Sequence, residues 1–302
     1  MNWGIAILNV ALVLLLSPLY EGVIRKLKAR IHSRMGPPII QPYLDLLKLL
    51  GKEELRSSAS FYFRLAPPLC LAAVLVTALL APMGGGTPLK GFSGDIIVFL
   101  CVSSLSAVAI IIGAFASGSP YASVGGSREM MMLLTVEPVM WIALITAVVK
   151  SGTLRFDEMV AHYATNGWAV SLALAGVVFL AALQAQLGKL PFDIPEADQE
   201  IMEGPFMEYS GPSLALYRWS FFARGLFLAS VLAQVFIPWA HFAHLAVWLN
   251  VLINLGWVLV LMLLVGLVDS VVPRLRIDQS MNWFARVACV GIVALLLAVG
   301  GL

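Results

Sequence analysis

Charge is scarce in this sequence. Charged residues make up 12% of its 302 residues, whereas hydrophobic residues make up 60%. A soluble globular domain carries about 25% charged residues, so the composition excludes an ordinary soluble domain. Apolar runs recur along the chain, and they approach the length of about 20 residues that a helix needs to cross the hydrocarbon core of a membrane. Because the runs are continuous and do not alternate with polar residues, they predict spanning helices and exclude a β-barrel.

Cysteine and histidine are also scarce, with three and four residues. Cys70, Cys101 and Cys289 lie singly in apolar runs, and His241 and His244 have no Asp, Glu or Cys close by in the sequence. Zinc and iron–sulfur sites need clustered ligands. We therefore expect structural thiols and no metal, redox centre or other cofactor in this chain. The sequence also lacks a Gly-rich phosphate loop and a nucleophile–base arrangement, and its basic first loop does not have the length or composition of a nucleic-acid binder.

The apolar runs predict an all-α, polytopic membrane protein that forms a single membrane domain over residues 1–302. Between the spans we expect long loops at 21–66, 117–129, 187–216 and 269–281. Within the first loop, Tyr43, Leu46, Leu47 and Leu50 recur at helical spacing, which predicts a short amphipathic helix in the membrane interface. This helix could anchor the rim of the bundle or form a wall of a binding cavity. The eight expected spans are residues 3–20, 67–82, 96–116, 130–149, 168–186, 217–238, 245–268 and 282–301.

Basic residues are distributed unevenly about these spans. Sixteen of the 19 Lys and Arg residues lie in or beside the four long loops or within the sixth span. The opposite side has only Lys90, Lys150 and Arg155. By the positive-inside rule, the long loops face the cytoplasm and both termini lie on the outer side of a prokaryotic plasma membrane. Most of these basic residues need no further role, and docking of a peripheral partner is the alternative.

Six of the 17 acidic residues gather in the segment GKLPFDIPEADQEIMEGPFMEYSG, residues 188–211. Pro191 and Pro195 prevent a continuous helix through its first half. Asp193 followed by Glu196 resembles a capping box, with Pro195 in the first turn, so we expect a helix to begin near residue 194. The segment should therefore be irregular first and helical afterwards.

On that expected helix, Glu196, Glu200 and Glu203 would share one stripe. One interpretation is a solvated acidic face. The other is a shielded group of carboxylates that folds back against the bundle, because its companions in the segment are apolar. Carboxylates packed in a low-dielectric place titrate near neutral pH, as a proton pathway requires.

Glu137 lies about two turns inside the fourth expected span. Intramembrane carboxylates are costly, so they are functional candidates, although Glu137 could instead pair structurally with a Lys or Arg of another span. Glu129 follows Arg128 at the interface, and we expect a local surface pair there. Glu21 and Asp269, at the inner ends of two spans, are weaker candidates of the same kind.

Four blocks of this sequence resemble one family. YEGVIRKLKARIHSRMGPPIIQPYLDLLKLLGKEE is similar to the first cytoplasmic segment of the complex I membrane subunit beside the quinone site. GGSREMMMLLTVEP, KLPFDIPEADQEIMEGPFMEYSG and PRLRIDQ resemble three further signatures of the same family, in the same order. The chain thus resembles the respiratory-chain NADH dehydrogenase subunit 1 family, which includes the membrane anchors of energy-converting (group 4) [NiFe] hydrogenases.

Two departures within these blocks indicate the branch. Complex I members usually carry Asn-Arg before the PFD motif and end the segment with GYxTEYSG. Here Gly188-Lys189 and Gly204-Pro205 stand in those places, as in anchors of formate hydrogenlyase and of CO-linked or ferredoxin-linked hydrogenases. The resemblance favours the hydrogenase branch and puts quinone binding in doubt.

The resemblance implies a subunit that docks a peripheral hydrogenase and couples its electron transfer to proton or Na⁺ translocation. The implied partners are hydrogenase large and small subunits, a ferredoxin-like iron–sulfur subunit and antiporter-like membrane subunits. They would carry the [NiFe] centre and [4Fe–4S] clusters, and a quinone would enter only if the chain were the quinone-site subunit of a complex I-type enzyme. A structural anchor without ion conduction is the third possibility.

Candidate site residues fall into two groups. The family's acidic positions correspond to Glu137, Glu196, Asp198, Glu200 and Glu208, Glu203 is an additional acid, and Glu129 and Asp269 complete the candidate proton pathway. The candidate partner-docking or cavity residues are Glu21, Arg25, Arg30, Arg34, Asp45, Lys48, Lys189, Asp193, Arg274 and Arg276.

Overall fold

The computed structural model describes residues 3–83, 95–166, 169–237 and 247–301, and within these ranges the regular structure is helical. Seven helices are long and apolar enough to cross a membrane, and α7 is a shorter apolar helix. This confirms the predicted all-α polytopic fold. In chain order the helices are α1 (Trp3–Ile31), α2 (Gln41–Leu50), α3 (Phe61–Leu80), α4 (Asp95–Ala116), α5 (Pro120–Ser151), α6 (Phe156–Asn166), α7 (Val170–Gln186), α8 (Asp198–Ile201), the 3₁₀ turn η1 (Gly204–Phe206), α9 (Gly211–Phe236), α10 (Val247–Val271) and α11 (Ile277–Val299).

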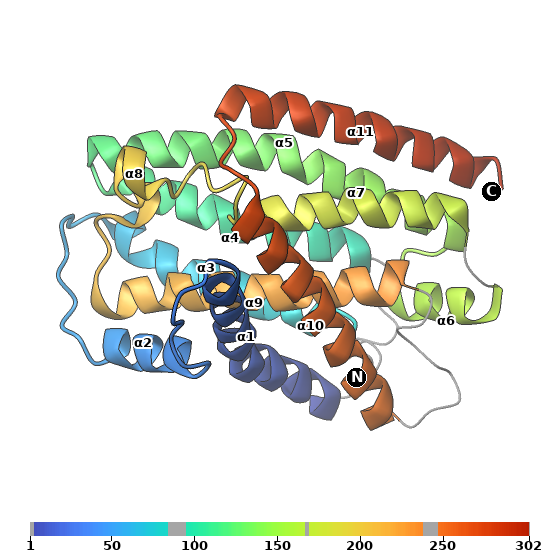
Figure 1. Cartoon of the computed structure of the whole chain (residues 1–302), viewed down its shortest axis with the longest axis horizontal. Coiled ribbons are helices and arrows are strands. Elements are labelled where there is room, and N and C mark those ends of the chain that lie inside the picture. Colours follow the sequence, from blue (N-terminus) through green and yellow to red (C-terminus); the bar gives the residue numbers. More distant parts are fainter. Residues whose placement is uncertain (1–2, 84–94, 167–168, 238–246, 302) are drawn as a thin grey trace.

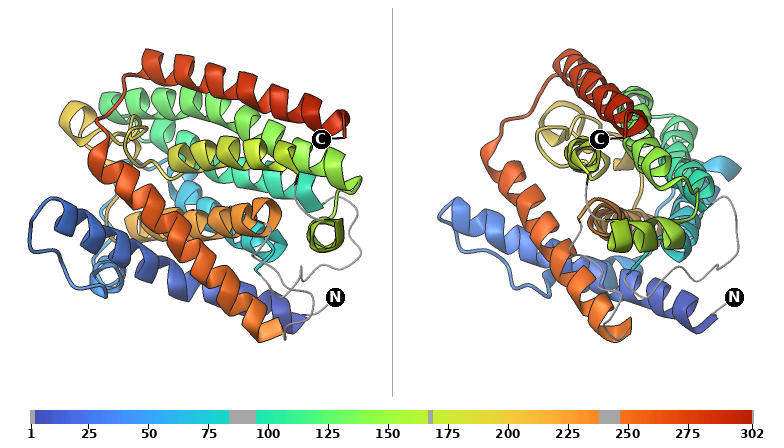
Figure 2. Two further views of the ribbon diagram at one scale, coloured as in Figure 1. Left: turned by 45° about the vertical axis from the view of Figure 1, so that its right-hand side comes forward. Right: turned by 90° about the vertical axis from the view of Figure 1, so that its right-hand side faces the viewer.

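The long helices form a bundle with two obliquely crossing members. Helices α5, α7 and α11 run side by side, and α3, α4 and α9 run roughly parallel to them through the middle (Figure 1). Helices α1 and α10 cross α9 and each other at an incline (Figure 2). We call the end of the bundle that carries α2, α8, the N-terminus of α5 and the 272–276 connection the basic end. Both chain termini lie toward the opposite end (Figure 1).

The core of the bundle surrounds α9. From Ala223 to Phe236 every residue of this helix is buried. Toward the opposite end, Phe99 makes edge-to-face contacts with Phe156 and Phe227, with ring centroids 5.5 and 5.8 Å apart. Edge-to-face aromatic pairs add stability beyond their buried area. The interior of this half is therefore built largely from apolar and aromatic side chains, with hydrogen-bonded polar ones such as Asn254 and Ser230 among them.

Several helices extend past the predicted boundaries. Helix α1 continues to Ile31, beyond the expected end of the first span at residue 20, and α3 and α9 begin six residues before the expected residues 67 and 217. The expected loop 117–129 is largely helical, because α5 begins at Pro120 and continues for 32 residues. Proline suits the first turn of a helix, where its missing N–H would have no partner. At 1.5 Å per residue α5 is about 48 Å long, longer than the roughly 30 Å hydrocarbon core, so one end of it extends past the apolar layer. The short helix α6 was not predicted.

The amphipathic helix predicted around Tyr43–Leu50 is present as α2. It packs against α1 and α9 at the basic end. Pro42 and Leu46 are buried, whereas Leu47 is exposed. Helix α2 thus covers the C-terminal part of α1 and brings its polar residues next to the site described below.

A charged network and two joined cavities at the basic end

The segment between α7 and α9 follows an irregular path that tertiary hydrogen bonds fix. Gln184 donates from Nε2 to the Leu190 carbonyl at 2.6 Å. The Leu190 N–H donates to the Asp269 carboxylate at 3.0 Å, and the Leu275 N–H donates to the Pro191 carbonyl at 3.0 Å. These bonds reach α7, α10 and the connection to α11. The acidic segment is therefore held inside the bundle's basic end and does not lie free in solvent.

The predicted helix from residue 194 is wrong. Helix α8 covers only Asp198–Ile201, and Asp193 pairs with Arg274 at 2.7 Å and does not cap a helix. Left-handed backbone at Met202 (φ 51°) and Glu203 (φ 64°) ends α8 after one turn. The local capping signal was overridden because distant backbone and side-chain partners bind the residues that would have started the helix.

Close packing against α5 explains the Gly-Pro pair of this segment. Gly204 has φ +47°, and a Cβ on it would lie 2.4 Å from the Pro195 carbonyl oxygen. A Cβ on Gly125 of α5 would lie 2.6 Å from Cδ of Pro205. Glycine is required at both positions because no larger residue fits this approach. Gly204 and Gly125 let η1 pack directly on α5.

Because the helix is absent, the three glutamates predicted on one stripe point in different directions. Glu196 is half-buried and lines the cavities described below. Glu200 is exposed and pairs with Arg128 at 2.6 Å, a bond that lowers the pKa of Glu200. Glu203 pairs with Arg218 at 3.0 Å. The predicted surface pair of Arg128 with Glu129 is also wrong, since Arg128 turns to Glu200.

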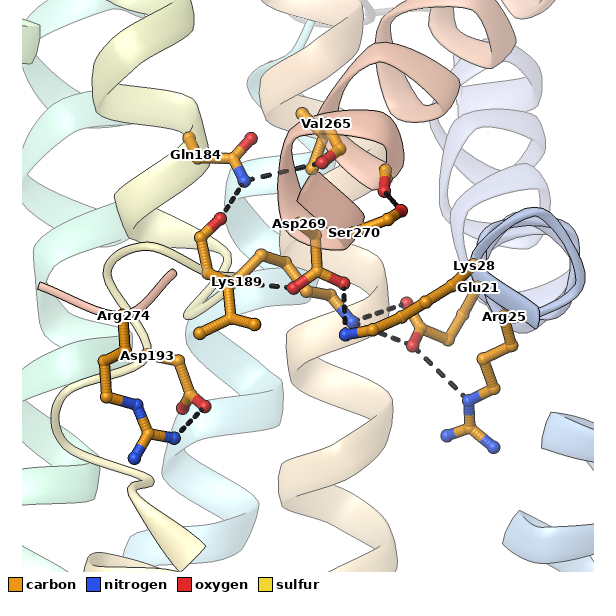
Figure 3. Close-up of polar contacts among 12 residues, drawn as sticks. Glu21, Arg25, Lys28, Gln184, Lys189, Asp193, Val265, Asp269, Ser270 and Arg274 are labelled. Atoms are coloured by element: carbon orange, nitrogen blue, oxygen red, sulfur yellow. Dashed lines mark hydrogen bonds and ion pairs between the residues drawn. The ribbon is translucent and has the colours of Figure 1, made fainter. Parts of the chain in front are cut away.

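A network of paired charges joins four segments of the chain. Lys189 donates to both oxygens of Glu21 on α1, at 2.9 and 3.1 Å (Figure 3). Arg25, one turn further along α1, lies 3.4 Å from Glu21 and 3.0 Å from Asp45 on α2. We call this set, together with Lys28 and Asp269, the Lys189 network.

The other end of the Lys189 network reaches α10. Lys28 pairs with Asp269 at 2.9 Å, and the Asp269 side chain is 6% exposed (Figure 3). Burial disfavours the charged form of Lys189, but the negative charges of Glu21 and Asp269 outweigh burial and raise the pKa of Lys189. The two buried acids of the network, Glu21 and Asp269, are tolerated because both are paired and hydrogen-bonded. The network therefore keeps Lys189 protonated.

Glu196 contrasts with the acids of this network. Burial raises the pKa of Glu196 to about 8, and the charges of Asp193 and Glu129 add to the shift. Arg218 and Lys189 act in the opposite direction but do not compensate. At neutral pH Glu196 is therefore mostly protonated and can release a proton within the physiological range.

Two cavities meet at Glu196. The larger, about 120 Å³, extends to the Lys189 network and has aromatic walls. The smaller, about 20 Å³, extends toward α5 and α9. Both are lined by Gly188, Glu196 and Phe221, and the smaller one is also lined by Glu129 and Arg224. Glu196 thus connects the charged network to the interior of the bundle.

Arg224 is a buried cation that sequence reasoning did not single out. Its side chain is 3% exposed on α9 and donates to the Ser106 hydroxyl at 2.7 Å and to the Gln186 carbonyl at 3.4 Å. Glu129 lines the same cavity, and Arg224 exerts its charge on both Glu129 and Glu137. An arginine inside a predicted span is costly and marks a functional candidate. That rule could have found this residue from the sequence.

Glu137 lies further along α5, toward the opposite end. It is half-buried, and the Ser104 hydroxyl of α4 lies within hydrogen-bonding reach. Its neighbours Leu134 and Pro138 are exposed on the surface of the bundle. Glu129 and Glu137, about 12 Å apart along α5, are thus both within the electrostatic reach of Arg224.

Arg30, Arg34, Lys48 and Glu208 line neither of the two cavities. Arg30, Arg34 and Lys48 are exposed at the basic end. Glu208 is half-buried in the turn before α9 and is not among the residues that line the two cavities. The side chain of Asp198 lies outside the described part of the structure.

Metal ligands do not gather in the described residues, where no group of three His, Cys, Asp or Glu side chains could hold an ion. Cys70 is buried, and Cys101 and Cys289 are exposed on their helices. His241 and His244 lie outside the described residues.

The fold and this site define a polytopic membrane subunit of the complex I type. The family model described as NADH dehydrogenase matches residues 4–300, so the chain belongs to the NADH dehydrogenase subunit 1 family. The predicted family is thus confirmed.

Similar proteins refine this assignment. The chain is 32% identical to hydrogenase-4 component C of Escherichia coli K12, over 90% of this chain and 88% of that protein. It is 33% identical to formate hydrogenlyase subunit 4 of the same organism, over 94% and 97%. It is 30% identical to a membrane subunit of the NADH-quinone oxidoreductase of Rickettsia peacockii, over 85% and 80%.

A solved structure has a similar fold. A chain of the membrane-bound sulfane sulfur reductase, an archaeal respiratory membrane complex, superposes with a TM-score of 0.87 and 26% identity. The match covers 97% of this chain and 98% of that one. The likeness therefore extends over almost the whole bundle, the irregular acidic segment included.

Proposed function

We propose that this chain is the membrane subunit of a multisubunit energy-converting [NiFe] hydrogenase, in which it docks the peripheral module and couples electron transfer to movement of H⁺ or Na⁺. Two relatives from hydrogenase complexes, matched over most of their length, support the hydrogenase branch. The observation that carries the coupling role is the position of Glu196 at the junction of the two cavities.

The titrating groups suggest an order of transfer. Glu196 holds a proton at neutral pH because its pKa is about 8. The larger cavity has room for several water molecules, since one water needs roughly 15 Å³. From Glu196 a proton can pass to Glu129 in the smaller cavity and then to Glu137. Arg224 keeps its positive charge throughout and stabilises whichever of these two glutamates is ionised.

The geometry favours a lateral exit from this chain. Beyond Glu137, α5 continues with buried apolar residues that include Met140 and Leu144, and Phe99 lies one and a half turns from Ser104 on α4. Exposed Leu134 and Pro138 flank Glu137 on its other side. A neighbouring membrane subunit of the antiporter-like kind could receive the ion there.

The basic end is the proposed docking face for the peripheral module. Arg30, Arg34 and Lys48 are exposed there, on or just after α1 and on α2. We place this face in the cytoplasm because of its excess of Lys and Arg. The proposed partners are the hydrogenase large and small subunits and a ferredoxin-like iron–sulfur subunit, which would carry the [NiFe] centre and [4Fe–4S] clusters.

The test compares Glu137→Gln with Glu208→Gln in the assembled complex, in sealed vesicles. Glu137→Gln should assemble and transfer electrons but lower ion translocation roughly 100-fold, the usual contribution of a proton-transfer group. Glu208→Gln is the matched control, because Glu208 is also half-buried but lies in the turn before α9, away from helix α5, which carries Glu129 and Glu137. Ion uptake per hydrogen that stays normal in Glu137→Gln would contradict the proposal.

Quinone reduction is a second candidate function. The larger cavity is walled by Phe206, Tyr217, Phe221 and Phe222, and a subunit of an NADH-quinone oxidoreductase is among the relatives. Its volume of about 120 Å³ is well below the 300–1,000 Å³ of typical small-molecule pockets, which argues against a quinone ring in this conformation. Inhibition of the complex by quinone analogues would favour this function over the first.

A structural anchor is the third candidate. It predicts that neutral substitutions of the buried acids change only the amount of peripheral subunit retained on the membrane. Full retention together with lost ion movement would exclude it.

A further inference from the structure

A third cavity, about 310 Å³ in volume, lies at the basic end, apart from the proposed relay. Its walls come from the N-terminal part of α5, from α8 and from the connection between α10 and α11, which lie close together in Figure 1. Three arginines line it: Arg128, Arg274 and Arg276. We call this cavity the arginine pocket.

We propose that the arginine pocket binds the phosphate of an anionic membrane lipid, with the acyl chains lying along the adjoining outer faces of α5 and α11. This inference rests on the chain spanning a membrane and does not depend on hydrogenase function or on ion movement.

The depth of the pocket matches the level of lipid phosphates. The span of α10 ends at Val271 and that of α11 begins at Ile277, so Arg274 and Arg276 lie on a connection at the membrane surface. Arg128 precedes the end of α5, Ser151, by about 35 Å at 1.5 Å per residue. The hydrocarbon core is roughly 30 Å thick. With Ser151 at the opposite surface of the membrane, Arg128 lies at or just outside the edge of the apolar layer.

The arginines have donors to spare. The Nε of Arg274 is buried and has no hydrogen-bond partner, although its Nη2 pairs with Asp193. Among the described residues no ion pair engages Arg276, whose backbone N–H donates to Gln279. Arg128 is paired with Glu200, but the Glu200 side chain is 53% exposed, and such pairs are weak enough to exchange. Guanidinium groups bind phosphate through two parallel hydrogen bonds.

The surroundings of the pocket favour a lipid over free phosphate or an acidic protein segment. Met131 and Leu134, which follow Arg128 on α5, are 49% and 65% exposed, and Met281, near the start of α11, is 41% exposed. A basic site bordered on its membrane side by exposed apolar side chains suits a molecule with both a phosphate and acyl chains. Basic pockets between spans on the cytoplasmic side commonly hold such headgroups.

The acids nearby limit the charge of the ligand. Asp278 lies in the first turn of α11 and also lines the pocket with Glu200. Asp193, which pairs with Arg274, is a third carboxylate beside the three arginines, so the site suits a ligand with no more than the single negative charge of a phosphodiester.

The experiment measures lipid binding to the full chain in nanodiscs of phosphatidylcholine that contain a small fraction of phosphatidylglycerol. Native mass spectrometry reads the bound phosphatidylglycerol. Arg276→Gln should weaken binding about tenfold, the lower range for a hydrogen bond to a charged group. Arg30→Gln is the matched control: it removes the same charge from an exposed position at the same end, outside the pocket. Equal binding in both variants would overturn the proposal.

Two further arms separate the alternatives. Millimolar inorganic phosphate should not displace the phosphatidylglycerol, and full displacement would mean that the pocket takes phosphate from any source. In the assembled complex, Arg276→Gln should retain its peripheral subunits. If these subunits were lost while lipid binding stayed normal, the arginines would bind a protein partner and the lipid proposal would be wrong. An unchanged thermal midpoint of Arg276→Gln checks that the variant is folded.

Discussion

The two halves of the bundle use buried residues in opposite ways. At the basic end, Glu21 and Asp269 are buried charges held by lysines from other segments, the half-buried Lys189 and Lys28. In the opposite half, the interior is filled by apolar side chains such as Phe99 and Phe227. Buried charge is costly unless it is paired, so a fold carries it only where partners from several elements converge. We therefore expect ions to enter this chain at the basic end and to leave it sideways into a neighbouring subunit, without crossing the opposite half.

The largest effect that would test this comparison is expected from Arg224→Met. Removing the buried cation leaves Glu129 and Glu137 without a positive charge, and breaking a buried charge arrangement typically costs about 3–5 kcal/mol. We expect a lower unfolding midpoint in detergent and a loss of ion translocation. Arg218→Met is the control. Both side chains of the Arg218–Glu203 pair are exposed, so loss of this pair should lower the free energy of unfolding by less than about 1 kcal/mol. Equal losses of unfolding free energy in the two variants would show that the buried Arg224 contributes no more to stability than the exposed Arg218.

The same contrast explains how far the sequence could predict this structure. Spans are set by the length of local apolar runs, so their number and approximate positions could be predicted. The Lys189–Glu21 pair joins residues 168 positions apart, and no local pattern indicates such a contact. The helix expected at residue 194 failed for the same reason: Asp193 is bound by Arg274, 81 residues away. Tertiary partners determine the irregular segment, and these can be predicted only when the packing of helices is known.

Family resemblance narrowed the candidate acids more than local pattern did. It selected Glu196, which lines one cavity together with Glu129, and Glu137, which lies further along the helix of Glu129. It also selected Glu200, which is exposed and paired with Arg128. The missing criterion is burial, because burial is what raises the pKa of a carboxylate toward neutrality, whatever the position of that residue in a motif.

A smaller effect is expected in the pH dependence that Glu196 controls. Its pKa is about 8 in the folded protein and about 4.5 when unperturbed, so the folded state binds more protons than the unfolded state between these values. Stability should therefore fall as pH rises from about 5 to 8 and level off above pH 8. Coupled ion movement should fall as pH rises through 8, because the carboxyl loses the proton it donates.

Glu196→Gln removes both effects if Glu196 is their source. The variant should show a flatter profile of unfolding midpoint against pH over the same range, and the inflection of ion movement near pH 8 should disappear. Glu200→Gln is the matched control, since Arg128 lowers the pKa of Glu200. An unchanged inflection in Glu196→Gln would assign the titration to another group.

The smallest effect is expected at Asp95, the acid that departs from the apolar character of the opposite half. Asp95 is the first residue of α4 and 1% exposed, and among the described residues neither of its carboxylate oxygens has a hydrogen-bond partner. A buried polar group without partners is destabilising, although the N-terminal end of a helix favours negative charge by up to about 1 kcal/mol. Because these effects oppose each other, Asp95→Asn should shift the unfolding free energy by less than about 1 kcal/mol and leave ion translocation unchanged. Loss of translocation in Asp95→Asn would place a working acid in the apolar half, and the ion path would then have to cross this chain from end to end.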